Sequence, residues 1–446
     1  MAELSGPLAR DADALARDVG ELARDADAPS READALARDA VDPLSSWRDR
    51  FLLPVAEDGT PAIYLAGQSL GLQPRSVRAA IEAELDAWAR LGIDAHFAPD
   101  RPWFTFEAPL REPMARIVGA RASEIAILNG LTVNIHLLLA SFFRPVGRRH
   151  RILADGPLFP SDRHALASHL AQRGLDPAAD LIVVVPRTGD ATVSTVDLEA
   201  AIRDHAPDLA LVFLSGVNFA TGQLQEIERL TAAGHAAGAT VGWDLAHAAG
   251  NVELQLHDWD VDFGAWCTYK YLNGGPGSVG SIFVHERFGR DRSVPRLGGW
   301  WGIDPERRFE MDAQFEPAAG AAGWQASGPP ILALAPLAAS LAIFDEVGMP
   351  ALRARSVALT GYLARLLETL PVDVITPIDP AARGAQLSLR LDAAPEVLAQ
   401  LAARGVVADF RAPDIIRVAP IPLYNTYGEV WRFVRLLREV IGDRLG

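Results

Sequence analysis

The sequence predicts an α/β protein with a mostly parallel central sheet in a large domain and a smaller α+β domain at the C-terminus. From about residue 120, short β-branched runs alternate with amphipathic segments, a pattern typical of βαβ units whose helices cover a parallel sheet. After residue 331 a long apolar helix leads into a second, shorter series of strands and helices. The 446 residues are enough for two such domains.

The large domain is expected over residues 96–332, where strands and helices alternate. We expect strands at Arg151–Ala154, Leu181–Pro186, Leu209–Leu214, Thr240–Trp243, Phe263–Thr268 and Ser281–His285, and helices at Arg163–Gln172, Val196–His205 and Glu226–Ala237. Ligands of such sheets lie beyond the carboxyl ends of the strands. Residues that follow the strands are therefore the first candidates for a site.

The C-terminal domain is expected over residues 333–446, and the segment 42–95 is expected to pack with it. Its predicted strands are Gln386–Leu391, Gly405–Phe410 and Ile415–Ala419, and its predicted helices are Pro395–Arg404 and Tyr427–Gly442. Residues 1–41 repeat Leu-Ala-Arg-Asp in steps of seven or fourteen. Because the apolar stripe of this repeat is narrow, we expect a helical or disordered extension; a coiled-coil partner site is the alternative.

Composition excludes several classes of protein. The net charge of -15 argues against binding to a nucleic-acid backbone, which requires a basic face. The single cysteine, Cys267, excludes an intramolecular disulfide and suits a reducing compartment. No apolar run reaches the roughly 18 residues of a membrane span, and the N-terminus has no signal-peptide pattern. We therefore expect a cytoplasmic protein without nucleic-acid or membrane partners.

Lys270 is the only lysine of the chain, beside 41 arginines. A drift towards arginine codons explains the excess of arginine but not the one lysine that remains. Arginine stays protonated and cannot form an imine, whereas an amine can. Imine chemistry at Lys270 is therefore one interpretation, and chance retention is the other.

A carboxylate is predicted to lie near this amine. Asp244 ends one predicted strand, and Lys270 ends the next, so the two side chains are expected at the same edge of the sheet. Pyridoxal 5'-phosphate (PLP) needs such a pair. The amine binds its aldehyde, and the carboxylate keeps its pyridine nitrogen protonated.

A phosphate group needs the free N–H groups at the start of a helix. Thr132, in Asn129-Gly-Leu-Thr-Val-Asn134, is expected to cap such a helix, so that the backbone of Leu131 and Thr132 can bind the phosphate. An ordinary capped core helix is the alternative. The stretch Gly275–Gly280 matches G-x-G-x-x-G, but it precedes a strand rather than a helix, so we interpret it as a tight loop and not as a dinucleotide site.

From about residue 42 to the C-terminus, many motifs in one order resemble those of kynureninase, a PLP-dependent family of fold type I. They are Gly67-Gln-Ser-Leu-Gly71, Leu131-Thr-Val-Asn134, Phe159-Pro-Ser-Asp162, Gly216-Val-Asn-Phe-Ala-Thr-Gly-Gln223, Asp244-Leu-Ala-His-Ala248, Leu256-His-Asp-Trp259, Tyr269-Lys-Tyr-Leu-Asn273, Pro295-Arg-Leu-Gly-Gly-Trp-Trp-Gly302 and Ile416-Arg-Val-Ala-Pro-Ile-Pro-Leu-Tyr-Asn425.

The resemblance implies hydrolysis of the Cβ–Cγ bond of L-kynurenine or 3-hydroxy-L-kynurenine to an anthranilate and L-alanine, a step of tryptophan catabolism. It implies a homodimer with shared active sites. The residues that it places around PLP are Leu131, Thr132, Phe159, Ser161, Asp162, Ser215, Asp244, His247, Tyr269, Lys270, Trp300 (from the partner chain) and Gly328.

The resemblance further implies that Arg417 holds the substrate carboxylate through its planar fork, while His96 and Ser327 contact the substrate. Lys270 is expected to act as the general base. Tyr269 is expected either to shuttle a proton or to bind only the phosphate. One departure concerns the aryl end of the substrate: the family often has Ser-Asn-Pro-Pro, where this chain has Ser327-Gly-Pro-Pro330. The preference between the two substrates therefore stays open.

Three other functions are alternatives to this one. A cysteine desulfurase needs a cysteine on a mobile loop, whereas Cys267 lies in a predicted strand. A PLP-dependent aminotransferase of the same fold would convert the cofactor to its amine form. A non-catalytic PLP-binding protein would not need Lys270, Asp244, Tyr269 and Arg417 together.

Overall fold

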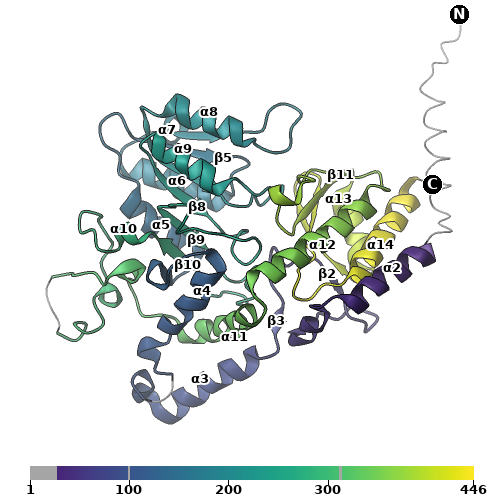
Figure 1. The fold of residues 1–446 in the computed structure, drawn as a ribbon, viewed down its shortest axis with the longest axis horizontal. Coiled ribbons are helices and arrows are strands. Elements are labelled where there is room, and N and C mark those ends of the chain that lie inside the picture. The colour runs from purple at the N-terminus through teal and green to yellow at the C-terminus, as the bar shows by residue number, and fades with distance from the viewer. Residues whose placement is uncertain (1–27, 99–100, 311–313, 446) are drawn as a thin grey trace, which may run out of the picture.

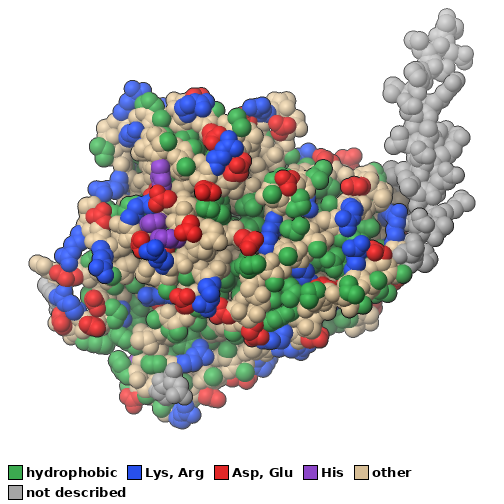
Figure 2. Space-filling view, in the orientation of Figure 1, with side chains coloured by type: hydrophobic (Ala, Val, Ile, Leu, Met, Phe, Trp, Pro, Cys, Tyr) green, Lys and Arg blue, Asp and Glu red, His purple; other side chains and the backbone are tan. Residues whose placement is uncertain are grey.

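The computed structural model describes residues 28–98, 101–310 and 314–445, which form two lobes (Figure 1). The larger lobe contains a seven-stranded sheet, and the smaller lobe contains a four-stranded sheet. Acidic and basic side chains are interspersed over the face shown in Figure 2, with no basic stripe across it.

The large sheet has the strand order β4-β10-β9-β8-β7-β5-β6. Its strands are β4 (Ile125–Ile127), β5 (Arg151–Asp155), β6 (Leu181–Val184), β7 (Leu209–Ser215), β8 (Thr240–Asp244), β9 (Phe263–Trp266) and β10 (Ser281–Val284). All neighbouring pairs from β9 to β6 are parallel, and β10 runs antiparallel to both β4 and β9. The predicted, mostly parallel sheet is confirmed.

Helices cover both faces of this sheet because its strands are apolar on both sides. Along β7, Leu211 and Phe213 pack in one apolar cluster with α5 and α6, while Val212 and Leu214 pack in another with α8 and α9. The helices of this lobe are α4 (Arg111–Val118), α5 (Leu131–Phe142), α6 (Pro160–Gln172), α7 (Pro177–Asp180), α8 (Thr195–His205), α9 (Ile227–Ala236) and α10 (Glu286–Gly289). The predicted layers of helix, sheet and helix are confirmed.

The smaller sheet has the order β11-β12-β15-β14. Its elements are β11 (Asp373–Val374), β12 (Leu387–Arg390), β14 (Asp409–Arg411) and β15 (Ile415–Val418), and α12 (Met349–Leu367), α13 (Ala394–Ala402) and α14 (Tyr427–Leu445) pack with it. The single strand predicted at Gly405–Phe410 is wrong. This stretch contains two strands. The first, β13 (Val406–Val407), pairs in parallel with β2 (Ile63–Tyr64), and the second, β14, pairs with β15 in the four-stranded sheet.

The long apolar helix is α11 (Ile331–Val347), which continues through Pro336. It packs on α3 (Val77–Leu91) and α4, and its buried residues, among them Leu334 and Leu341, belong to the core of the larger lobe. Among the described residues, no single helix is long and apolar enough to cross a membrane. Helices α11 and α12 are long and apolar enough only when they are counted as one helix, and the chain bends by 83° between them.

The fourth copy of the N-terminal repeat lies in α2 (Ala28–Val41), and the first three copies lie outside the described residues. Helix α2 packs on α14. The Asp39 carboxylate accepts hydrogen bonds from the backbone N–H groups of Tyr427 (2.7 Å) and Gly428 (2.9 Å). It therefore caps the first turn of α14, where N–H groups lack helical partners.

The remaining elements are short. They are the antiparallel pair β1 (Phe51–Leu52) and β3 (Gln73–Pro74) and the 3-10 helices η1 (Ser45–Arg50), η2 (Gly92–His96), η3 (Trp103–Thr105), η4 (Ala108–Leu110), η5 (Ala122–Glu124), η6 (Trp300–Gly302), η7 (Gly320–Trp324) and η8 (Pro380–Ala382).

Candidate active site

A cavity of about 380 Å³ opens beyond the carboxyl ends of β5, β7 and β8. This is where parallel sheets bind their ligands. Its walls also include the first turns of α5 and α6. The lining residues are Gly130, Leu131, Thr132, Val133, Asp155, Pro157, Leu158, Phe159, Ser161, Asp162, Ser215, Val217, Phe219, Asp244, Ala246, His247, Tyr269 and Lys270.

Three strands each place a polar side chain at this edge. Asp155 ends β5, Ser215 ends β7 and Asp244 ends β8. Ser215 donates to Asp155 from its backbone N–H (2.8 Å) and from its hydroxyl (2.5 Å). Asp244 accepts a hydrogen bond from the N–H of Ala246 (2.8 Å). The register that pairs Ser215 with Asp244 fixes these groups side by side.

Asp162, in the first turn of α6, lies next to Asp244 in the wall of the cavity. Burial raises the pKa of Asp162 well above its ordinary range, and the neighbouring Asp244 carboxyl raises it further, while Lys270 partly opposes both. Like charges held close together in a dry site cannot both ionise easily. Asp162 therefore retains its proton at pH values where an exposed aspartate has lost it.

Lys270 reaches the cavity from a bend four residues beyond β9, and not from the end of a strand as predicted. Its Nζ lies 5.8 Å from the centre of the Tyr269 ring. The pKa of the Tyr269 phenol is raised, mainly by burial, so its O–H stays protonated near neutral pH. The Gly71 N–H holds this bend through the Tyr269 carbonyl (2.8 Å), and a Cβ at Gly71 would lie 2.4 Å from the Lys270 carbonyl oxygen.

Helix α5 begins at Leu131 and its N-cap is Gly130, so the prediction that Thr132 caps the helix is wrong. Glycine at this position leaves open space where a side chain would stand. The first backbone bond runs from Asn134 N–H to Gly130 O, which leaves the N–H groups of Leu131, Thr132 and Val133 at the cavity. This arrangement suits a phosphate.

The cavity also contains buried polar atoms that have no partner in the described part of the chain. These are Oδ1 of Asp162 and Nδ1 of His247. Burial lowers the pKa of His247 well below its ordinary value, and Lys270 lowers it further, so its ring is neutral. Phe159, 37% exposed, presents an aromatic surface beside Phe219. An amine, carboxylates, unpaired polar atoms, an aromatic ring and a helix N-terminus together fit an aromatic cofactor with a phosphate group.

Four predicted residues do not line this cavity: His96, Trp300, Ser327 and Gly328. His96 packs on the edge of Trp103, with ring centres 5.3 Å apart. Trp300 is 45% exposed and lies in an aromatic cluster with Phe104, Trp301 and Phe309. Ser327 and Gly328 lie on the surface, Gly328 beside the ring of Trp301.

Arg417 also lies outside the cavity lining, and its guanidinium already has a carboxylate partner. On the neighbouring strand β14, Asp409 accepts from both Nε (2.6 Å) and Nη2 of Arg417. Nη1 donates to the carbonyl of Phe219 (2.6 Å), a cavity residue, and Nη2 also approaches the hydroxyl of Ser69 (3.3 Å). The Nη1 end of this guanidinium thus lies directly behind the cavity wall.

Sequence reasoning missed Asp155, Phe219 and Asp409. Asp155 follows a predicted strand just as Asp244 does, so the same signal predicts it. Phe219 lies inside the motif Gly216–Gln223. Asp409 falls within a stretch that was predicted as one strand, and its pairing with Arg417 depends on the observed register of β14 and β15.

The carboxyl pair predicts how the stability of the cofactor-free protein changes with pH. Because folding raises the pKa of Asp162, the folded state keeps a proton that the unfolded chain releases. The free energy of unfolding should therefore fall as pH rises from the ordinary aspartate range through the raised value. Asp162→Asn should flatten this dependence in urea denaturation of the cofactor-free protein, whereas the exposed control Asp190→Asn should not. An unchanged slope in Asp162→Asn would contradict the assignment.

The fold is similar to that of solved PLP-dependent enzymes. A cysteine desulfurase from Thermococcus onnurineus NA1 matches with a TM-score of 0.70 and 19% identity, over 86% of this chain and 95% of its own. The cystine C–S lyase C-DES, in complex with cysteine persulfide, matches with a TM-score of 0.72 and 20% identity, over 85% and 97%. A variant of C-DES is known with glycine linked covalently to its PLP cofactor. The predicted type I fold is confirmed.

Full-length relatives are far more similar in sequence. The kynureninase of Koribacter versatilis is 50% identical over 400 residues, 89% of this chain and 94% of the relative. That of Salinispora tropica is 51% identical over 405 residues, 88% and 94%. Kynureninase 2 of Aspergillus oryzae is 45% identical over 438 residues, 91% and 94%. The model of the kynureninase C-terminal domain matches residues 352–437. The chain therefore belongs to the kynureninase family.

Proposed function

We propose that this protein is a PLP-dependent kynureninase, which hydrolyses L-kynurenine, 3-hydroxy-L-kynurenine or both. The observation that carries the proposal is the cavity in which the only lysine of a kynureninase-family chain lies with Asp244 and the start of α5. The Cβ–Cγ bond is broken, the oxygen of water enters the anthranilate carboxylate, and Cβ gains a proton to become the methyl group of L-alanine.

The residues present suit the cofactor. We propose that Lys270 binds its aldehyde, Asp244 its pyridine nitrogen and the N–H groups of Leu131 and Thr132 its phosphate, with Phe159 against the ring; that all of them line one cavity supports this proposal. Ser161, Ser215 and His247 complete the wall. When bound, PLP supplies an electron sink for the bonds at Cα. Asp162, protonated beside Asp244, adds no negative charge of its own next to the Asp244 carboxylate.

Two side chains are proposed to move protons. The Lys270 amine, released when the substrate amine replaces it, takes the proton from Cα and returns it there. The Tyr269 phenol, kept protonated by burial, is a suitable donor to Cβ. Binding of the phosphate alone is the other role open to Tyr269.

Arg417 is proposed to bind the substrate carboxylate with the end of its guanidinium. Asp409 holds Nε and Nη2 on the other edge of the fork and so fixes the plane of the group. The substrate would replace the weaker Ser69 contact and approach past Phe219.

The aryl end of the substrate and the partner chain are proposed to meet at the aromatic surface of Trp300, Phe97 and Phe309, which are all more than 40% exposed. Trp300 lies outside the cavity of its own chain, which is consistent with a role in the partner's site in a homodimer. His96, Ser327 and Gly328 are proposed to contact the aryl ring. A cytoplasmic location is also proposed, supported by the single, buried Cys267.

A desulfurase activity is disfavoured, although the solved neighbours include such enzymes. Cys267 is 3% exposed, and burial raises the pKa of its thiol. A buried, protonated thiol is a poor nucleophile. The relatives that share about half of the sequence also favour kynureninase over an aminotransferase.

The function is tested by supplying the PLP-loaded protein with L-kynurenine or 3-hydroxy-L-kynurenine. Anthranilate from L-kynurenine, or 3-hydroxyanthranilate from 3-hydroxy-L-kynurenine, should form in an amount equal to that of L-alanine from at least one substrate, with the aryl product followed by its fluorescence. Lys270→Ala should abolish turnover, and borohydride should fix the cofactor covalently to the wild type but not to this variant. No product from either substrate would refute the function, while covalent labelling of Lys270→Ala would refute only the role of the lysine.

The role of Tyr269 is tested by Tyr269→Phe, which removes the hydroxyl and keeps the ring. If the phenol delivers a proton, kcat should fall by about a hundredfold or more while cofactor affinity changes little. Cofactor affinity is measured by equilibrium dialysis against PLP. A loss of PLP affinity at near-normal kcat would instead assign Tyr269 to the phosphate.

The role of Arg417 is tested by Arg417→Lys, with Arg411→Lys as the matched control. Both arginines pair with Asp409, but only Arg417 contacts the cavity wall at Phe219. Losing charged hydrogen bonds to the carboxylate should raise KM about ten- to a hundredfold in Arg417→Lys. Arg411→Lys should leave KM nearly unchanged. Equal effects of the two substitutions would show that the lost guanidinium contacts with Asp409 are responsible, and not a substrate contact.

A further inference from the structure

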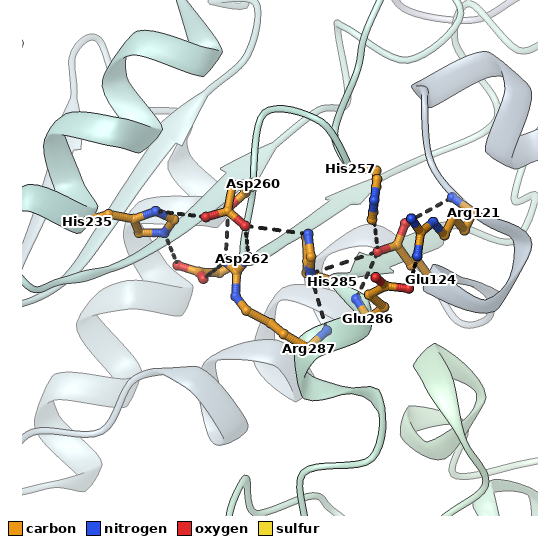
Figure 3. A network of polar contacts seen from close by, with 9 residues as sticks. All are labelled: Arg121, Glu124, His235, His257, Asp260, Asp262, His285, Glu286 and Arg287. Carbon is orange, nitrogen blue, oxygen red and sulfur yellow. Dashed lines mark hydrogen bonds and ion pairs between the residues drawn. The ribbon is translucent and has the colours of Figure 1, made fainter.

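Three potential metal ligands converge at the edge of the large sheet opposite the cavity: Glu124, His257 and His285 (Figure 3). Glu124 ends η5 directly before β4, whereas the cavity lies beyond the other end of that strand. His257 lies in the loop before β9, within the motif Leu256–Trp259, for which the proposed reaction has no use. His285 directly follows the antiparallel strand β10.

The ligand atoms lie at distances that suit one ion. One atom of each side chain lies within 4.8 Å of those of the other two. Glu124 Oε1 is 2.9 Å from His257 Nδ1 and 4.0 Å from His285 Nδ1. Ligands of a tetrahedral Zn²⁺ lie about 3.4 Å apart, given bonds of about 2.1 Å. The two observed distances bracket this value, and the ligand atoms of the two histidines lie within 4.8 Å of each other.

Glu124 is fully buried, which makes the charge of its carboxylate costly unless it is compensated. It accepts hydrogen bonds from the backbone N–H groups of Arg121 (2.9 Å) and Glu286 (2.8 Å). Its ion-pair contacts in the described ranges are with the two histidines alone. The guanidinium groups of Arg121 and Arg287 pair with other carboxylates. A cation between Glu124 and the histidines would therefore supply the charge that this carboxylate lacks.

His285 is oriented as a metal ligand usually is. Its Nδ1 accepts from the N–H of Arg287 (3.2 Å), so this nitrogen carries a lone pair and not a proton, and it lies 4.0 Å from Glu124 Oε1. Its Nε2 lies 3.5 Å from the carboxylate of Asp260. Metal-binding histidines commonly place their second ring nitrogen against a carboxylate in this way. A bound ion would replace the hydrogen bond from the Arg287 N–H at this lone pair.

The ion has a route to the site. The His257 side chain is 19% exposed, and its ring stacks on that of His285 with centres 5.0 Å apart. Figure 2 shows histidine side chains gathered on this face beside α10, among acidic and basic groups. Two imidazoles and one carboxylate favour a borderline divalent metal such as Zn²⁺ or Co²⁺ over Mg²⁺ or Ca²⁺.

We propose that Glu124, His257 and His285 bind one divalent transition-metal ion, which ties η5, the loop before β9 and the end of β10 together. The ion replaces the proton between His257 and Glu124, and water completes its coordination. Its role is structural, because the site and the cavity lie at opposite edges of the sheet.

The test uses tag-free, PLP-loaded protein that has been treated with a chelator and then dialysed against Co²⁺ or Zn²⁺ alone. The wild type should retain about one ion per chain, show the visible absorption of tetrahedral Co²⁺, and melt at a higher temperature with Zn²⁺ than without it. Crystals soaked in Zn²⁺ should give an anomalous peak between Glu124 and His257.

His257→Gln should lose this ion, because Gln keeps a hydrogen-bond donor for Glu124 but not the imidazole. His235→Gln is the matched control, since His235 contacts Asp260 and Asp262 in the same network and lies outside the triad. It should retain the ion. Wild-type protein that retains no metal, or retains it only at the cofactor, would overturn the proposal whatever the variants do; so would unchanged binding in His257→Gln.

Discussion

The enforced closeness of two buried carboxyl groups, Asp162 and Asp244, is the constraint on which the site depends. Burial and mutual repulsion hold a proton on the pair. In the proposed complex, the protonated pyridine nitrogen of PLP would then contact one charged carboxylate rather than two. Lys270 lines the same cavity as Asp155, Asp162 and Asp244. The sheet supplies the rigidity, because Asp244 is fixed by its register with β7 and Asp162 by the start of α6.

Patterns that depend on local sequence predicted the large lobe well. Its strands alternate with amphipathic helices, and only β4, three residues long, was not among the predicted strands. The smaller lobe was harder, because the split between β13 and β14 is set by a partner strand more than 300 residues away, β2. The limits between the domains remain a prediction; α11 packs in the core of the larger lobe.

The site shows the same division. Asp244, Lys270 and the start of α5 follow from what strand ends and helix starts can do, although the capping residue is Gly130 and not Thr132. The Asp409–Arg417 pair could not be found from periodicity, because it arises from strand register. The roles of His96, Ser327, Gly328 and Trp300 remain predictions. These side chains lie away from the cavity of their own chain.

The lone lysine has a consequence for chemistry on this molecule. A reagent that modifies primary amines meets one side chain in the whole protein, and that side chain stands in the proposed cofactor cavity. Apart from the α-amino group, Lys270 is therefore the one site that such a reagent can modify. The protein with bound cofactor and the protein without it should then differ in how far Lys270 is labelled. Coupling the protein to a surface or a dye through lysine would fill the cavity and would not modify the outer surface.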